Sequence, residues 1–155
     1  LGAAPGSWAQ VCARKGLKVV GLDREPVEPL AGCTFLEGDF REEAVRVRLR
    51  AVLDGRADLV LSDMAAAATG QRLVDRLRAE ELAELVLGFC DEVLAADGDV
   101  LIKLVKGAEP AARTAALPRF RNVQFVRPPA TRKDSSEMFL LGRGHRAGAE
   151  APARA

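Results

Sequence analysis

The 155-residue sequence predicts an α/β fold with a mostly parallel sheet, helices on both faces and an antiparallel strand at the C-terminal end. Short apolar runs of strand length alternate with stretches of helical periodicity, which is typical of βαβ units. Three successive runs end at, or just before, an aspartate. The last two runs are separated by ten residues, which are too few for a helical crossover, so we expect an antiparallel hairpin.

The first half of the chain is expected to hold two helices and three strands. A helix over 6–15 begins just past a Pro-Gly turn, and apolar runs predict strands over 18–22, 34–36 and 58–62. Residues 41–53 have the spacing of an amphipathic helix. Its apolar face comprises Ala44, Val45, Leu49, Val52 and Leu53.

The second half begins with a long predicted helix over 73–96, for which Gly98 is a suitable C-terminal stop. The inner stripe of this helix comprises Leu77, Leu82, Leu85, Val86, Phe89, Val93 and Leu94. The remaining expected elements are a strand over 99–105, a helix over 110–120, and strands over 122–126 and 137–141.

The length suits one domain with its own core, which we place at 1–142, followed by a disordered low-complexity tail over 143–155. The chain is 48% apolar and 29% charged, which is typical of a globular protein. No uncharged apolar run approaches the roughly 20 residues that span a bilayer, and no signal peptide opens the chain. We therefore expect a cytoplasmic protein, or a mitochondrial one in a eukaryote, with no membrane partner.

The cysteines and the single histidine limit the chemistry. Cys12, Cys33 and Cys90 are odd in number and far apart, so we expect neither a disulfide framework nor a zinc site. His145 falls in the Gly/Ala/Arg-rich tail, so a Ser–His or Cys–His pair has no base, and a histidine-rich metal site is excluded. Catalysis would depend on carboxylates, lysine, arginine or a cofactor.

The net charge of +1 conceals an asymmetry. Residues 1–100 carry 12 basic and 18 acidic side chains, whereas residues 101–155 carry 11 basic and 4 acidic ones. A basic last third favours an anionic partner, and nucleic acid is the commonest large one. The alternative is codon bias, since the chain has 18 arginines and only 5 lysines.

Acidic residues gather where open α/β sheets bind ligands, beyond the carboxyl ends of the strands. Asp23, Asp39 and Asp63 follow three successive predicted strands. The opening Leu-Gly-Ala-Ala-Pro-Gly-Ser-Trp brings small residues to a helix N-terminus, where a ligand can approach the backbone. Asp23, 17 residues after Gly6, stands where an acid binds ribose hydroxyls in nucleoside-binding sheets. The alternative is an aspartate that only closes a turn.

Lys103 stands inside the apolar run Val-Leu-Ile-Lys-Leu-Val over 100–105. A buried lysine without a partner is costly, so we expect it to be neutralised or paired with a carboxylate. Asp63 and Glu137 fall near the same end of the sheet and could converge on it. The alternative is a lysine whose stem packs while its amine reaches solvent at the rim.

Six motifs in register resemble one enzyme family. They are LGAAPGSW, GLD at a strand end, GDF, LSDMA, LIKLV and SSEMFLL, and they run from Leu1 to about Gly142. The chain resembles the FtsJ family of S-adenosylmethionine-dependent ribose 2′-O-methyltransferases, in its ribosomal RNA (23S-type) branch. The resemblance implies a Rossmann-like methyltransferase domain over 1–142 that methylates a uridine 2′-hydroxyl. Its partner would be ribosomal RNA or the large ribosomal subunit.

The resemblance also implies where the cofactor S-adenosylmethionine binds. The family's loop positions fall on Gly6 and Trp8, its ribose-binding acid on Asp23 and its adenine-binding acid on Asp39. Asp63 matches an acid shared between the cofactor and the catalytic centre. The family's chemistry needs no metal.

The family's catalytic set is Lys-Asp-Lys-Glu, and its last three members match Asp63, Lys103 and Glu137. A 2′-hydroxyl is a poor nucleophile, so the enzyme must align it in line with the methyl group and remove or direct its proton. Lys103 could accept that proton or hydrogen-bond the oxygen to orient it. Asp63 and Glu137 would hold Lys103 and favour its charged form, whereas burial favours the neutral form, and both possibilities stay open.

The basic last third acquires a role through the same resemblance, because residues 127–137 are similar to the family's basic loop before the catalytic glutamate. Arg127, Arg132 and Lys133 are therefore candidates for phosphate contacts that position RNA without reading its sequence.

The chain also departs from the family pattern. Ala66 and Ala67 stand where Pro-Asn usually follows SDMA, and Ser7 replaces a common glycine. The family's first catalytic lysine, its N-terminal basic helix and its first, central strand precede the glycine loop, so we expect a truncated chain. These departures motivate an alternative, a relative that binds RNA or the ribosome without turnover. A third reading is a methyltransferase for a small molecule or a protein.

Overall fold

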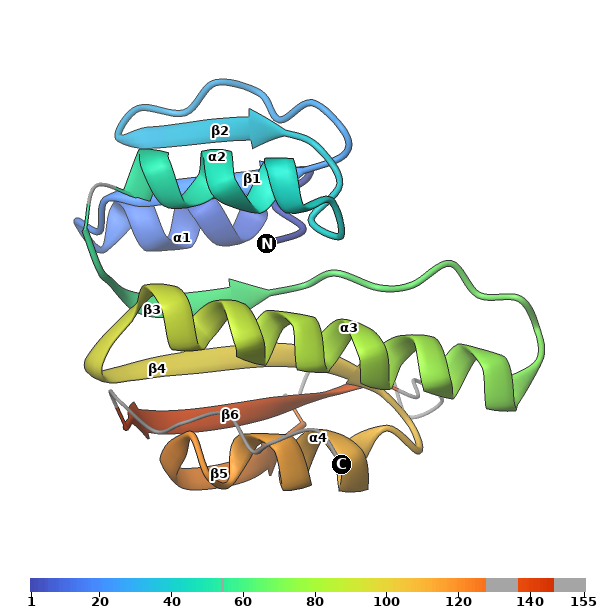
Figure 1. Cartoon of the computed structure of the whole chain (residues 1–155). Coiled ribbons are helices and arrows are strands. Elements are labelled where there is room, and N and C mark those ends of the chain that lie inside the picture. Colours follow the sequence, from blue (N-terminus) through green and yellow to red (C-terminus); the bar gives the residue numbers. More distant parts are fainter. Residues whose placement is uncertain (54, 128–136, 147–155) are drawn as a thin grey trace. The chain divides into compact units, whose positions relative to one another are not determined.

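The computed structural model describes residues 1–53, 55–127 and 137–146 (Figure 1). Helices and strands alternate along it, so the predicted α/β class is confirmed. The strands form two separate sheets. Contacts along the chain divide it into two compact units, Leu1–Gly55 and Arg56–Ala155.

The first unit consists of two parallel strands and two helices. Asp23, the last residue of β1, lies opposite Glu37, the last residue of β2, so both strands end at the same edge. Both helices contact β1 and bury apolar side chains, of which Val45 and Leu49 come from α2. The elements are α1 (Ser7–Arg14), β1 (Val19–Asp23), β2 (Cys33–Glu37) and α2 (Glu43–Leu53). They confirm the predicted elements to within two residues, although Ala44 of the predicted apolar face is exposed.

The second unit is a four-stranded sheet of order β3–β4–β6–β5, covered by α3 and α4. β3 is parallel to β4, and β6 is antiparallel to both β4 and β5, so the predicted C-terminal hairpin is confirmed. The two helices contact each other and the sheet, so they share one face, and Figure 1 shows α3 lying along β3 and β4. The bounds are β3 (Ala57–Ser62), α3 (Arg72–Val93), β4 (Leu94–Val105), α4 (Glu109–Ala116), β5 (Phe120–Val126) and β6 (Glu137–His145).

The boundary between α3 and β4 differs from the prediction. The helix ends at Val93, and the next residues, which were predicted as helix, begin the strand. Leu94 is buried and pairs with Ala57 of β3, and this sheet pairing outweighs the helical periodicity. The register then shifts before Asp99 pairs with Leu59, so Gly98 lies within this irregularity rather than ending a helix.

The predicted inner stripe of α3 is wrong at its N-terminal end. Leu77 is 50% exposed, because the first turns of α3 extend beyond the ends of β3 and β4 (Figure 1). Ala83, Leu87 and Cys90 are buried in the following turns. Burial also raises the pKa of the Cys90 thiol, which disfavours the reactive thiolate.

Two further boundaries are corrected near the C-terminus. Phe120, predicted at the end of a helix, begins β5 and lies fully buried opposite His145. β6 continues to His145 instead of ending at residue 141, because Gly142 and Arg143 pair with Val123 and Asn122. Residues 143–145 are therefore strand rather than tail, and residues 147–155 lie outside the described residues.

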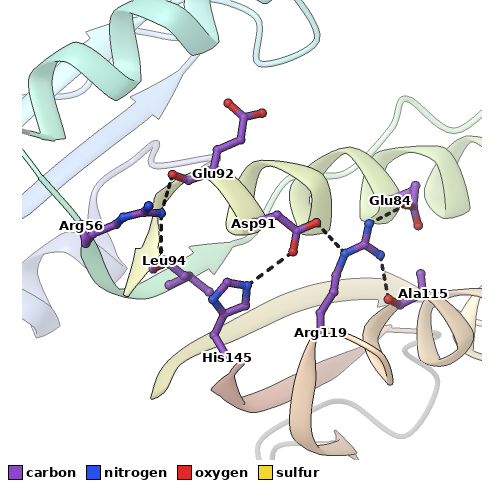
Figure 2. Close-up of polar contacts among 8 residues, drawn as sticks. All are labelled: Arg56, Glu84, Asp91, Glu92, Leu94, Ala115, Arg119 and His145. Atoms are coloured by element: carbon purple, nitrogen blue, oxygen red, sulfur yellow. Dashed lines mark hydrogen bonds and ion pairs between the residues drawn. The ribbon is translucent and has the colours of Figure 1, made fainter. Parts of the chain in front are cut away.

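A buried polar cluster links α3, α4, β5 and β6 (Figure 2). Arg119 donates from Nε to Asp91 Oδ2 at 2.8 Å, from Nη2 to Glu84 Oε1 at 3.1 Å and from Nη1 to the Ala115 carbonyl at 2.7 Å. Burial alone would lower the pKa of Arg119, but the bonds and charges of Asp91 and Glu84 outweigh it and raise that pKa. His145 is also buried, with Nε2 3.4 Å from Asp91 Oδ1, and is not the tail residue that the sequence predicts.

Candidate functional site

The opening loop is tied to the carboxyl end of β1 by its own backbone. The amides of Gly2 and Ala3 donate to the Leu22 carbonyl at 2.9 and 3.1 Å. The amide of Ala4 donates to Asp23 Oδ2 at 2.8 Å. Asp23 therefore holds the loop as well as closing the strand, which a simple turn residue would not do.

Gly6 precedes α1 with a φ of 113°, a conformation in which other residues are strained. A Cβ at this position would lie 3.4 Å from Val27 Cγ1, so the loop packs closely against the rest of its unit. Trp8 is half-buried in the first turn of α1. A loop of this kind presents backbone rather than side chains at a helix N-terminus, which suits a polar ligand.

Asp23 is half-buried, and some of the acceptor positions of its carboxylate are used by backbone hydrogen bonds. Oδ2 accepts from Ala4, and Oδ1 accepts from the amide of Glu25 at 3.0 Å. A carboxylate offers about four acceptor positions, so within the described residues each oxygen keeps one for a further donor. Two adjacent acceptors on one carboxylate match the two neighbouring hydroxyls of a ribose.

Asp39 lies two residues beyond β2. The amide of the preceding Gly38 donates to the Asp23 carbonyl at 2.9 Å, which brings the backbone at Asp39 near that of Asp23. Asp39 Oδ1 accepts from the Arg41 amide at 2.9 Å and from Arg41 Nε at 3.2 Å, and its Oδ2 accepts from Arg41 Nη2 at 3.1 Å. The Arg41 side chain, followed by its amide, holds the pKa of Asp39 below its ordinary value, although burial opposes this. Asp39 is therefore an ionised, oriented acceptor at the edge where β1 and β2 end.

In the second unit, Lys103 Nζ lies 3.1 Å from Asp63 Oδ1. Asp63 directly follows β3 and Lys103 belongs to β4, and the parallel register that pairs Ser62 with Ile102 makes them neighbours. The side chains of Lys103 and Asp63 are 14% and 35% exposed, so the amine is more sheltered than its partner. The predicted pairing of Lys103 with a carboxylate is confirmed, whereas a catalytic role for either residue stays a prediction.

Glu137 is the first residue of β6, and its side chain lies outside the described residues. The antiparallel register pairs it with Val105, and pairs Phe139 with Lys103. Residues two apart on a strand share a face, so Glu137 and Lys103 occupy diagonal positions on one face of the sheet.

Of the three predicted phosphate contacts, Arg127 directly follows β5 and is exposed. β5 points the same way as β4, so Arg127 stands at the edge of the sheet where β4 ends. Arg132 and Lys133 lie outside the described residues.

A small cleft of about 20 Å³ opens beside Lys103, between α3 and the ends of β3 and β4. That volume holds about one water molecule. Met64, Ala65 and Ala66 line it from the segment after Asp63. Ala66 therefore borders the site, whereas Ala67 is exposed and its carbonyl accepts a hydrogen bond from Arg78 at 3.3 Å.

Within residues 1–53, 55–127 and 137–146, no three His, Cys, Asp or Glu side chains are grouped so that they could hold a metal ion. Over the same ranges, no helix combines the length and apolar character that crossing a membrane requires.

Arg41 was not predicted as a site residue, although it donates three hydrogen bonds to Asp39. The sequence carries a signal for this contact, because in Asp-Phe-Arg over 39–41, two residues beyond β2, the arginine can fold back on the aspartate. The buried cluster of Arg119, Asp91 and His145 was also missed, since its members lie far apart in sequence.

Comparisons with known proteins agree with the motifs. The family model described as FtsJ-like methyltransferase matches residues 1–145. A protein named ribosomal RNA large subunit methyltransferase E from Gluconobacter oxydans (strain 621H) is 45% identical over 148 residues, which cover 94% of this chain and 55% of the relative. A relative of the same name from Xanthobacter autotrophicus (strain ATCC BAA-1158 / Py2) is 45% identical over 157 residues, with coverages of 97% and 62%. The chain thus spans somewhat over half the length of these curated relatives.

A solved structure supports the fold. The crystal structure of a protein named as a ribosomal RNA methyltransferase from Plasmodium falciparum aligns with a TM-score of 0.80 at 24% identity, over 93% of this chain and 83% of that one. At this identity the likeness concerns the fold alone.

Proposed function

The chain belongs to the FtsJ-like methyltransferase family, and from this premise we propose that it methylates a ribose 2′-hydroxyl, specifically of a uridine, in large-subunit ribosomal RNA. The observation that carries the proposal is the Lys103–Asp63 ion pair at 3.1 Å, where two parallel strands end. Relatives named ribosomal RNA large subunit methyltransferase E support the choice of RNA.

The first unit fits the nucleoside part of S-adenosylmethionine. We assign Asp23 to the ribose hydroxyls, because each of its oxygens has accepted one backbone hydrogen bond and keeps one position. We assign Asp39 to the adenine and the loop containing Gly6 and Trp8 to the remainder of the cofactor. When bound, S-adenosylmethionine supplies a sulfonium methyl group that is already a good electrophile, so activation is needed at the hydroxyl.

Lys103 is proposed to act on the 2′-hydroxyl. A hydroxyl attacks in line only if its lone pair is oriented and its proton is accepted or directed elsewhere. Asp63 Oδ1 holds Nζ from one side, and the neighbouring Ile102 and Leu104 are buried, so the strand that carries Lys103 is fixed. Glu137, diagonal to Lys103 on the same face, is proposed as its second carboxylate partner.

RNA would be held by basic residues at the edge of the sheet where β4 and β5 end. Arg127 is exposed at this edge. Arg132 and Lys133 follow it in the sequence, within the last 55 residues, which carry 11 basic and 4 acidic side chains. Such side chains contact phosphates and set the position of the RNA.

The test is transfer of a labelled methyl group from S-adenosylmethionine to large-subunit ribosomal RNA that lacks the modification, offered both free and within the assembled subunit. We expect label in RNA, at a uridine whose 3′ phosphodiester resists alkaline cleavage, because that cleavage needs a free 2′-hydroxyl. Binding of cofactor and RNA without turnover would favour a non-catalytic relative, a reading that Ala66 and Ala67 motivate because they replace the family's usual Pro-Asn and Ala66 borders the cleft. A labelled product that survives ribonuclease unchanged would favour a protein or small-molecule substrate.

A further inference from the structure

We propose that Arg41 is a positioning residue that holds the Asp39 carboxylate in one orientation and leaves one acceptor position for the exocyclic amine of an adenosine-type cofactor. The proposal deepens the proposed function and rests on it, since the assignment of Asp39 to the adenine comes from there.

Arg41 donates three hydrogen bonds to the carboxylate of Asp39. Nε donates to Oδ1 at 3.2 Å and Nη2 donates to Oδ2 at 3.1 Å, which is the two-bond fork that a guanidinium forms with a carboxylate. The Arg41 amide donates to Oδ1 at 2.9 Å, and the Glu42 amide donates to the Asp39 carbonyl at 3.0 Å. Rotation of the carboxylate would break both bonds of the fork, so its plane is fixed.

The fork also limits what Asp39 can accept. Of the about four acceptor positions of a carboxylate, Oδ1 uses two on the Arg41 amide and Nε, and Oδ2 uses one on Nη2. Within the described residues, one position remains, on Oδ2. One fixed acceptor suits a single amine N–H, in contrast to Asp23, whose two oxygens each keep a position and suit a diol.

A fixed anionic acceptor discriminates between purines. An adenine presents a 6-amino donor, whereas a 6-oxo purine presents a carbonyl oxygen at that place, an acceptor whose partial negative charge is repelled by the carboxylate. Arg41 favours this selection in a second way, because its hydrogen bonds keep the pKa of Asp39 low and the carboxyl ionised. A protonated carboxyl could donate a hydrogen bond and would tolerate the oxygen.

Arg24 provides a matched control. Its charge also lowers the pKa of Asp39, but it contributes no hydrogen bond to that shift. Arg24 is exposed, as is Arg41 at 62%, and exposed ion pairs contribute little to stability. Replacement of either arginine should therefore leave the fold intact. Loss of Arg24 removes only a nearby positive charge, whereas loss of Arg41 also removes the hydrogen bonds that orient the Asp39 carboxylate.

The experiment is calorimetric titration of the full chain, and of its R41A, R41K and R24A variants, with S-adenosylhomocysteine and its 6-oxo analogue S-inosylhomocysteine. We expect the unaltered chain and R24A to prefer the amino form by about tenfold or more, as for a hydrogen bond to a charged group. R41A and R41K should lose most of that preference, since neither keeps the fork. Circular dichroism checks that each variant is folded.

The pH profile supplies a second readout. Binding of S-adenosylhomocysteine needs ionised Asp39, so affinity falls as pH drops through the pKa of this group. In R41A that pKa should return toward its ordinary value of about 3.9, so R41A should lose affinity at a higher pH than the unaltered chain. R41K, which keeps a positive charge, should lie between them.

The outcomes separate the two proposals. If R41A keeps both the amino preference and the pH profile, or binds the amino form more tightly because Arg41 competes for Asp39, the inference about Arg41 is overturned and the proposed function stands. If the unaltered chain binds neither compound, the proposed function itself fails.

Discussion

Arg119 Nε and Asp91 Oδ2 are 2.8 Å apart, and this contact ties the start of β5 to α3. The Arg119 side chain is 4% exposed, and Asp91 lies between it and buried His145 (Figure 2). A guanidinium placed so deep is tolerated only because Asp91, Glu84 and the Ala115 carbonyl accept its hydrogen bonds. The second unit therefore depends on a polar contact in its interior as well as on apolar packing.

Substitution of Arg119 by methionine should destabilise the protein by about 3 kcal/mol, because it leaves Asp91 without its main partner while preserving most of the volume. Urea denaturation followed by circular dichroism measures the loss. Arg121→Ala is the matched control, since Arg121 pairs with Asp97 at the surface, where the side chains are 65% and 63% exposed. Its effect should stay below about 1 kcal/mol, and equal effects of the two variants would contradict the role given to Arg119.

Replacement of Lys103 by alanine should abolish methyl transfer while the affinity for S-adenosylhomocysteine changes little. Nζ is the only part of Lys103 assigned to the hydroxyl. Asp63 is already 35% exposed in the unaltered chain, so water can solvate its carboxylate once Nζ is removed. Rates with labelled S-adenosylmethionine and calorimetric titration separate these effects. Lys18→Ala removes an exposed lysine just before β1, at the opposite end of that strand from Asp23, and should retain activity. Full activity of Lys103→Ala would exclude Lys103 as the group that acts on the hydroxyl.

Much of the fold and part of the site could be predicted from the sequence, because both depend on local pattern. Apolar runs predict the strands, and Asp23 and Asp63 lie at the carboxyl ends of β1 and β3, as the sequence predicts. The Lys103–Asp63 pair could be predicted because an amine inside an apolar strand needs a carboxylate nearby.

The remainder depends on contacts distant in sequence. Periodicity extends the α3 helix through Leu94, whereas pairing with Ala57 makes that residue strand. Composition assigns His145 to a tail, whereas its place opposite Phe120 makes it part of the core. Neither partner could be identified before the sheet order was known.

Gly6→Ala should weaken S-adenosylhomocysteine binding. An alanine at a φ of 113° is strained, by about 1–2 kcal/mol, so the loop should shift away from the position in which Asp23 holds it. Gly16→Ala is the control, because Gly16 also has a positive φ, of 77°, but a Cβ there would meet nothing within 4 Å. Both variants should lose stability and only Gly6→Ala should lose affinity. Equal affinities would show that the loop does not contact the cofactor.

Asp75 should make the segment after Asp63 sensitive to acid. Asp75 Oδ1 accepts from the amide and the hydroxyl of Thr69, each at 2.7 Å, and these bonds hold the pKa of Asp75 below its ordinary value. A lowered pKa in the folded state means that the stabilisation is complete above the ordinary value of about 3.9 and is lost as pH falls through the lowered one.

Amide hydrogen exchange at Thr69 measures this loss, with protection expected to be constant above about pH 5 and to fall below pH 4. Asp75→Asn should remove the dependence and leave Thr69 weakly protected at every pH, because an amide oxygen is a weaker acceptor than a carboxylate. Glu81→Gln, on the same helix and exposed, is the control and should behave like the unaltered chain. If Thr69 in Asp75→Asn lost its protection at the same pH as in the unaltered chain, an acidic residue other than Asp75 would hold this segment, which also contains the cleft residue Ala66.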